Sequence, residues 1–238
     1  MYTELFGLDY EQIPLNEDFT LPVEKFLGGN GGAVICNPNA PTGRTLPLSE
    51  IRRILDANPD AVVLVDEAYA DFGAQSAVEL IDEYPNLVVV CTMSKSRSLA
   101  GMRIGYALGN ADLIAGVNCV KNSFNSYPLD RLALAAGEAA IRDVEYFERT
   151  RTMVMETRER TVQRLRAMGF FVHESNANFL FITHPDKTGE QLQQALRARG
   201  VLVRWFNKPR ISQYLRVSIG TDAEMDAMCA ACEDILKG

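Results

Sequence analysis

Three short apolar runs stand out in the first half of the chain. They are Ala33-Val-Ile-Cys36, Ala61-Val-Val-Leu-Val65 and Leu87-Val-Val-Val-Cys91. Unbroken apolar runs of this length are typical of strands buried on both faces of a parallel sheet. Stretches with helical spacing alternate with them, at residues 47–55 and 112–117. This alternation predicts an α/β unit with a mainly parallel sheet.

The second half of the chain has a different pattern. Residues 129–168 are alanine-rich, then charged with helical spacing, and contain no proline, which predicts one long helix. After it come strand-like runs at 170–173 and 178–183, a helix at 189–199, strands carrying Arg204 and Arg216, and a helix from Asp222. We therefore predict two domains, a large α/β domain over residues 1–145 and a small α+β domain over residues 146–238.

Composition excludes several classes of protein. The chain has 238 residues, 47% of them hydrophobic, which is enough to bury a sizeable core. Its net charge of -7 argues against nucleic acid or an anionic membrane surface as a partner. The sequence shows no membrane-spanning run and no signal peptide, so a cytoplasmic location is expected. The cysteines and histidines lack the spacing of a metal site, so we predict no metal.

Polar residues that could bind a ligand or take part in catalysis follow two of the predicted strands. Asp66 comes directly after the second apolar run, and Thr92, Ser94 and Lys95 come after the third. The carboxyl ends of parallel strands meet at one edge of the sheet, where ligands of open α/β sheets bind. Arg103 follows the lysine, and its planar guanidinium suits a phosphate group. A lysine, a carboxylate and a phosphate site together are what a protein needs to hold pyridoxal phosphate covalently.

Each of these residues alone has a simpler interpretation. An Asp-Glu pair after a strand is often a helix cap or a solvated loop, and a lysine between serines usually lies on the surface. Their order, and their position after two buried strands, favours the cofactor site.

Four segments in chain order resemble the landmarks of the fold type I, class I/II aminotransferases. They are Asn37-Pro-Asn-Ala-Pro-Thr-Gly43, Asp66-Glu-Ala-Tyr69, Ser94-Lys95 with Arg103, and Leu215-Arg-Val-Ser-Ile-Gly-Thr221. Within that group the chain is most similar to the histidinol-phosphate aminotransferases, as residues 122–131, 176–180 and 203–206 indicate. The resemblance implies an α/β fold, with a three-layer α/β/α large domain that is incomplete at its amino terminus and a smaller carboxyl-terminal α+β domain.

The resemblance also implies a role for each matching residue. Lys95 would hold pyridoxal 5'-phosphate as a Schiff base and move the proton during catalysis. Asp66 would keep the pyridine nitrogen protonated, and Tyr69 would donate a hydrogen bond to the phenolic oxygen. The cofactor phosphate would be bound by Thr92, Ser94 and Arg103.

Two arginines would bind the substrates. Arg216 would take the carboxylate of glutamate, and Arg204 the phosphate of histidinol phosphate, because a bidentate guanidinium fits either anion. The simpler interpretation, an arginine that points to water, is favoured by pattern alone for Arg204. The family context of Arg216 favours the substrate role.

The chain departs from the family in two places. Ala40 stands where much of the family has an asparagine that touches the cofactor. Asn37 or Asn39 could supply that contact, or both could simply shape the turn around the neighbouring prolines. The chain also opens at a point that resembles the interior of the large domain. We therefore expect about the first third of the family's length to be absent, with its phosphate loop and ring-stacking aromatic residue.

The expected function is transamination of histidinol phosphate with 2-oxoglutarate in histidine biosynthesis, giving imidazole acetol phosphate and glutamate. A homodimer is expected, and Tyr127 could either reach the partner's site or pack against its own chain. Three alternatives stay open: a different class I/II aminotransferase, a phospho-amino-acid decarboxylase of the same fold, or a weak or inactive dimerising fragment. The sequence does not decide which amino donor or acceptor is preferred.

Overall fold

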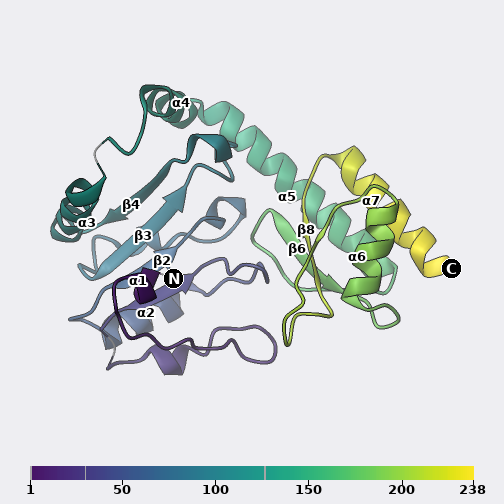
Figure 1. Ribbon diagram of the computed structural model, residues 1–238, viewed down its shortest axis with the longest axis horizontal. Helices are drawn as coiled ribbons and strands as arrows, with labels where there is room; N and C mark the ends of the chain where they lie inside the picture. The colour runs from purple at the N-terminus through teal and green to yellow at the C-terminus, as the bar shows by residue number, and fades with distance from the viewer. Residues whose placement is uncertain (1, 30, 126) are drawn as a thin grey trace.

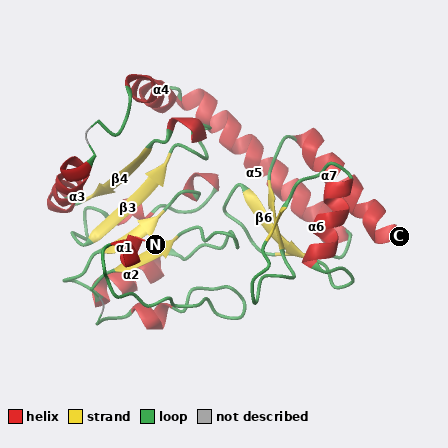
Figure 2. Cartoon of the chain, in the orientation of Figure 1, coloured by secondary structure: helices red, strands yellow, loops and turns green. Residues whose placement is uncertain are grey.

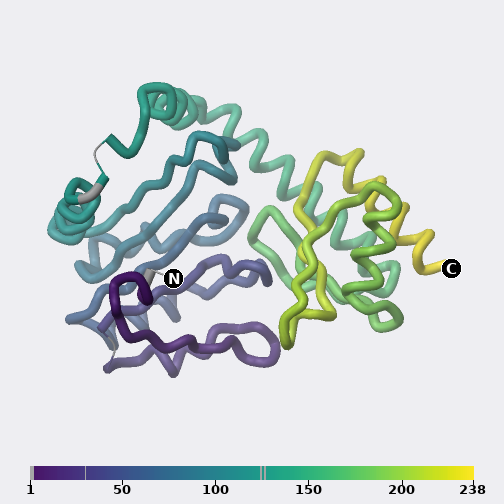
Figure 3. Tube along the Cα trace, viewed as in Figure 1, coloured from purple at the N-terminus to yellow at the C-terminus, as the bar shows by residue number. Residues whose placement is uncertain are grey.

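The computed structural model describes residues 2–29, 31–125 and 127–238 and arranges them in two units joined by a long helix (Figure 1). Each unit contains a four-stranded sheet. The joining helix, α5, covers Val144–Ala167 and runs from the first unit to the second. The amino terminus lies on the first unit and the carboxyl terminus on the far side of the second (Figure 3). The domain boundary expected between residues 145 and 146 falls in the first turn of α5 and stays a prediction.

The first sheet has the mainly parallel topology that the alternating pattern predicts. Its strands, in spatial order, are β1 Ala33–Cys36, β2 Val63–Asp66, β3 Leu87–Thr92 and β4 Gly105–Gly109. β1, β2 and β3 are parallel, and β4 is antiparallel to β3. β2 and β3 therefore bring their carboxyl ends, Asp66 and Thr92, to the same edge of the sheet.

One face of this sheet forms the core of the first unit. Alternate residues of the three parallel strands, among them Ile35 and Val65, pack against helix α2 (Leu48–Ala57) through Ile51 and Ile54. Fully burying an aliphatic side chain of this size contributes roughly 1.5–3 kcal/mol.

The other face of the sheet is covered unevenly. Val88 on β3 is buried, Leu64 on β2 is half-buried and Val34 on β1 is 69% exposed. The prediction that these apolar runs are buried on both faces was therefore wrong for β1 and β2. An apolar run can show that a strand lies in a sheet, but it does not show which neighbours cover each face.

The remaining helices of the first unit lie around the sheet. They are α1 Tyr2–Leu5, α3 Ala111–Phe124, α4 Arg131–Arg142 and the 3-10 helices η1 Val23–Phe26, η2 Ala70–Phe72, η3 Ala77–Leu80 and η4 Ala100–Met102. The single helix predicted over residues 129–168 is in fact two, α4 and α5, because Asp143 adopts a non-helical backbone between them. Its carboxylate accepts a hydrogen bond from the Tyr146 N–H at 3.1 Å and caps α5.

The second unit is an antiparallel sheet with helices on one side (Figure 2). Its strands, in spatial order, are β5 Phe171–Val172, β6 Phe179–Thr183, β8 Leu215–Ser218 and β7 Arg204–Trp205. Helices α6 (Gly189–Ala198) and α7 (Asp222–Lys237) pack with the end of α5 against β6 and β8 in one apolar core. Within the described ranges, no helix is both long and apolar enough to cross a membrane.

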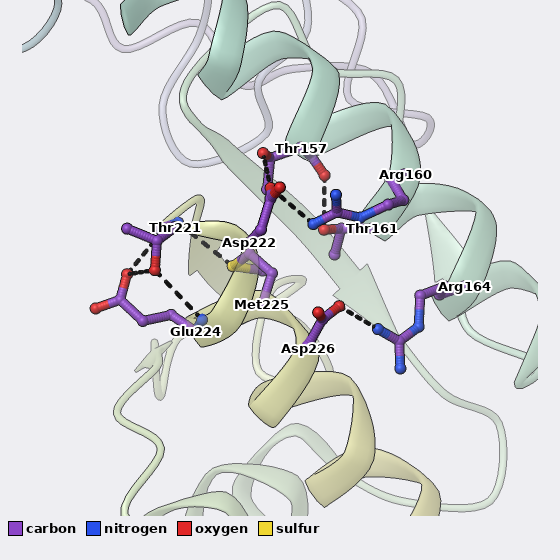
Figure 4. Close-up of polar contacts among 10 residues, drawn as sticks. Thr157, Arg160, Thr161, Arg164, Thr221, Asp222, Glu224, Met225 and Asp226 are labelled. Carbon is purple, nitrogen blue, oxygen red and sulfur yellow. Dashed lines mark hydrogen bonds and ion pairs between the residues drawn. The ribbon is translucent and has the colours of Figure 1, made fainter.

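Polar contacts fix α7 against α5 (Figure 4). Asp222 accepts hydrogen bonds from the Thr157 hydroxyl and from Arg160, which is 2.7 Å away. The Arg160 guanidinium, with the Thr157 hydroxyl, lowers the pKa of the Asp222 carboxyl to about 2. A second ion pair, 2.6 Å long, joins Arg164 and Asp226. α5 is therefore tied firmly to the second unit.

The two units also meet at the Asn37–Thr45 loop. The Asn176 N–H donates to the Gly43 carbonyl at 3.0 Å, and the Asn176 side chain donates to the Thr45 hydroxyl at 3.1 Å. Nearby, the Phe19 ring packs edge-on against Phe181 of the second unit, with ring centroids 5.7 Å apart. These contacts fix the first landmark loop relative to the small sheet.

We expect Gly43→Ala to lower the free energy of unfolding by about 2–4 kcal/mol. Gly43 has a φ of +76°, and a Cβ there would lie 2.3 Å from the Ser175 Oγ and 3.2 Å from its Cα. Backbone strain and overpacking both destabilise, by roughly 1–3 kcal/mol each. Gly200→Ala is the matched control, since Gly200 has a similar φ of +80° and open space around its Cβ position. Urea denaturation measures both, and equal losses would contradict this account of the contact.

Candidate active site

Asp66 and Lys95 reach one edge of the first sheet from adjacent strands. Asp66 is the last residue of β2, and Lys95 follows the end of β3 by three residues. The Ala68 N–H donates to the Asp66 Oδ1 at 3.0 Å, which fixes the direction of the carboxylate. The structure thus places both charged residues at the edge of the sheet where the sequence pattern predicts them.

Tyr69 lies between the lysine and the second unit. The Lys95 Nζ is 5.3 Å from the centroid of the Tyr69 ring, and that ring packs edge-on against Phe179 at 5.0 Å. None of the ion pairs among the described residues involves Lys95, and its side chain is exposed. The amine is therefore free to react with a ligand.

The residues expected to bind phosphate come from the end of β3 and from the loop just before β4, which pairs with it. The Thr92 Oγ1 is 2.9 Å from the Ser94 Oγ, and Thr92 pairs with Gly105 in the register of β3 and β4. Arg103 precedes β4, in a left-handed conformation with φ +56°. Its Nη1 donates to the Ala100 carbonyl at 2.8 Å, and its side chain is exposed, so the other guanidinium N–H groups face solvent. Two hydroxyls and a guanidinium form a suitable donor set for an anion.

Arg204 and Arg216 lie directly opposite each other on adjacent strands. They are register partners of β7 and β8, so their side chains project from the same face of the sheet. Both guanidinium groups stack near the Phe206 ring, at 5.3 and 5.9 Å from its centroid. Neither takes part in an ion pair among the described residues, and the Arg216 Nε is buried without a partner. Like charges placed opposite each other are destabilising, so this pair favours bound anions.

Arg216 is linked to the lysine side of the site through Phe179. Its guanidinium lies 5.3 Å from the Phe179 ring, the same ring that packs against Tyr69. Sequence reasoning did not assign Phe179 a role, although the Asn178-Phe179 pair was part of the resemblance. An aromatic residue in an apolar strand gives no signal that separates this contact from ordinary core packing.

The two candidate asparagines differ in how many hydrogen bonds their side chains already make. Asn37 is buried, and its amide group is bonded at both ends to the Leu46 backbone, at 2.7 and 3.2 Å. This supports the turn-shaping interpretation of Asn37. Asn39 accepts a hydrogen bond from Thr42 at 2.9 Å and is half-buried, so its amide nitrogen is still available. The cofactor contact of either residue stays a prediction.

Glu67, the second residue of the Asp-Glu-Ala-Tyr segment, stabilises the fold through buried hydrogen bonds. It is buried and accepts hydrogen bonds from the Ser76 hydroxyl and the Ala77 N–H, both at 2.6 Å. Burial raises the pKa of its carboxyl above the ordinary value, against the lowering effect of these two donors. Glu67 therefore anchors the start of η3, and its two carboxylate oxygens are both occupied there.

Comparison with known proteins gives consistent results. Residues 4–232 match the family model described as aminotransferase class I and II. A histidinol-phosphate aminotransferase of Marinomonas sp. (strain MWYL1) is 55% identical over 99% of this chain, which spans 67% of that relative. One from Acinetobacter baylyi is 53% identical over 94% of this chain, which spans 62% of its length. The chain thus spans about two thirds of these relatives.

A solved structure agrees in fold. The histidinol-phosphate aminotransferase of Sinorhizobium meliloti, determined in complex with pyridoxal-5'-phosphate, superimposes with a TM-score of 0.85 at 23% identity. The alignment covers 99% of this chain and 66% of that one.

Proposed function

The chain belongs to the class I and II aminotransferases, and on that premise we propose that it transfers the amino group of histidinol phosphate to 2-oxoglutarate. The products would be imidazole acetol phosphate and glutamate. The observation that carries the proposal is the opposed pair Arg204 and Arg216, which offers two anion sites on one face of the small sheet. The identity of more than half the residues with named histidinol-phosphate aminotransferases supports it.

The residues at the sheet edge fit pyridoxal phosphate. Lys95 carries an amine without a carboxylate partner among the described residues, Asp66 ends the adjacent strand, and Thr92, Ser94 and Arg103 supply donors for a phosphate. These five residues and Tyr69 would hold the cofactor. When bound, it would supply an electron-withdrawing ring that stabilises negative charge at the substrate alpha carbon.

The chain's own residues would then divide the work. The Lys95 Nζ would hold the cofactor covalently and, once displaced by substrate, accept and return a proton as general base and acid. The Asp66 carboxylate would keep a proton on the ring nitrogen. The Tyr69 hydroxyl, on a ring fixed between Lys95 and Phe179, would orient the phenolic oxygen.

The arginine pair would select substrates by charge. Arg216 would bind the carboxylate of glutamate or 2-oxoglutarate, because it stacks on Phe179 next to Tyr69 and its buried Nε has no hydrogen-bond partner among the described residues. Arg204, exposed at the sheet edge, would bind the phosphate of histidinol phosphate. The two substrates would bind in turn, and each bound anion would offset part of the mutual repulsion of the two guanidinium groups.

We also expect the active form to be a homodimer. Tyr127 is 94% exposed, so it does not pack against its own chain as one interpretation of the sequence required. An exposed tyrosine and the exposed apolar side chains of α4, such as Leu132 and Leu134, are suited to contact with a second copy.

A substrate panel tests the proposal. The purified chain, given pyridoxal phosphate and 2-oxoglutarate, should form glutamate from histidinol phosphate and at least about tenfold less from histidinol, because one phosphate–arginine contact is lost. Release of CO2 from a phosphorylated amino acid would instead support a decarboxylase, and equal turnover of both donors would contradict the role of Arg204. Turnover at the rate of a full-length relative would exclude the alternative of a weak or inactive fragment. A monomer mass by light scattering would contradict the homodimer.

A further inference from the structure

A buried arginine in the middle of α5 links the two units at the candidate active site. Arg158 is only 5% exposed, although it lies on a helix whose other arginines are largely at the surface. Its Nη1 donates to the Phe72 carbonyl at 2.9 Å and to the Ala177 carbonyl at 3.0 Å, and its Nε lies 3.0 Å from Glu159. The two N–H groups of the Arg158 Nη1 thus bind one backbone carbonyl of each unit.

The first of these carbonyls belongs to the turn that carries Tyr69. Phe72 ends the 3-10 helix η2, which begins directly after Tyr69. The same turn is held by the Arg151 Nη1, which donates to the Asp71 carbonyl at 3.2 Å, and by the Ser96 hydroxyl, which donates to the Asp71 carboxylate. Ser96 is the neighbour of Lys95, so the position of this turn sets the position of Tyr69 relative to the lysine.

The second carbonyl belongs to the segment that carries Phe179. Ala177 is fully buried two residues before Phe179, whose ring contacts both the Tyr69 ring and the Arg216 guanidinium. A shift of the Ala177 carbonyl would therefore move the aromatic ring that both Tyr69 and Arg216 contact.

We propose that Arg158 is a positioning residue that sets the spacing between Tyr69, on the cofactor side of the site, and Arg216, on the substrate-carboxylate side. This inference rests on the proposed function for its catalytic meaning. Arg158 bonds to the backbone on both sides, so it fixes the spacing whatever side chains surround it. A lysine is a single ammonium on a flexible stem and does not reproduce the rigid planar group.

The test compares Arg158→Met, Arg158→Lys and Arg160→Met. Arg160 is the matched control, because it lies on the same helix and bonds Asp222 at the start of α7, within the second unit. Hydrogen–deuterium exchange of the cofactor-free chain should be faster in Arg158→Met at both 69–73 and 177–179. With pyridoxal phosphate bound, that variant should raise the KM for glutamate about tenfold, with a smaller change in kcat, and shift the pH midpoint of the cofactor absorbance. Arg158→Lys should recover part of each effect.

The outcomes separate this inference from the proposed function. If Arg158→Met lowers only the thermal midpoint, as Arg160→Met is expected to do, or if exchange rises at only one of the two segments, the inference is wrong. If Arg158→Met does not fold, Arg158→Lys gives the same exchange comparison. If the wild-type chain binds no pyridoxal phosphate, the proposed function fails, while the exchange result still decides whether Arg158 couples the two segments.

Discussion

Replacing Lys95 with alanine is expected to lower the rate of transamination by about 10⁴-fold, the upper end of what a positioned proton-transfer group contributes. Under the proposed function the amine holds the cofactor and then moves the proton, and it lies 5.3 Å from the centroid of the Tyr69 ring. The measurement is the single-turnover rate with saturating pyridoxal phosphate, together with the absorbance of the bound cofactor.

The control for this variant is Lys121→Ala. Lys121 lies on α3, is exposed, and is outside the candidate site. It should leave the rate and the absorbance unchanged. A Lys95→Ala protein that turned over within tenfold of the wild type would show that another group moves the proton.

Replacing Asp66 with asparagine is expected to lower the rate by about 100-fold or more. The carboxylate would balance the positive charge of a protonated ring nitrogen, and removing one partner of a desolvated charge pair costs roughly 3–5 kcal/mol. The amide keeps the size of the side chain and its bond from the Ala68 N–H, so the turn should persist. The rate is measured at saturating cofactor to separate chemistry from binding.

Glu67→Gln is the matched control for Asp66→Asn. The two carboxylates are neighbours in the chain, but Glu67 bonds Ser76 and Ala77 and supports η3. Its replacement should lower stability while leaving the rate per folded molecule close to that of the wild type. A larger rate loss in Glu67→Gln than in Asp66→Asn would mean that the two roles are assigned to the wrong residues.

The sequence predicted the parts of this site that depend on local pattern. Apolar runs located β2 and β3, and because parallel strands end at one edge, they also placed Asp66 and Lys95 at the same edge of the sheet. The start of the last helix at Asp222 was likewise predictable. Thr221, directly before it, forms a capping box with Glu224, and that spacing is visible in the sequence.

Features that depend on distant contacts were not predictable in this way. The break between α4 and α5 at Asp143 could not be predicted from the sequence. Aspartate occurs both within helices and at their ends, so its presence alone does not mark a helix boundary. The exposure of Val34 depends on what covers the sheet. The role of Arg158 depends on carbonyl groups 86 and 19 residues away in the chain, and a sequence pattern does not identify backbone acceptors.

The arginine pair illustrates the same division. Sequence pattern alone favoured a solvent-facing Arg204, and its side chain is indeed exposed. The pattern did not indicate that the register of β7 and β8 would set it opposite Arg216. That register follows from the folded sheet and not from either strand alone. Their roles toward phosphate and carboxylate remain proposals, for which the opposed charges are the physical support.

The most direct test of the account is the site at which pyridoxal phosphate attaches to the wild-type chain. The mixture of chain and cofactor is reduced with borohydride, digested, and mapped by mass spectrometry. The account predicts the added mass on Lys95 and on none of the other lysines, which are Lys25, Lys121, Lys187, Lys208 and Lys237. Stable attachment at any of those five, or an unmodified Lys95 at saturating cofactor, would contradict it.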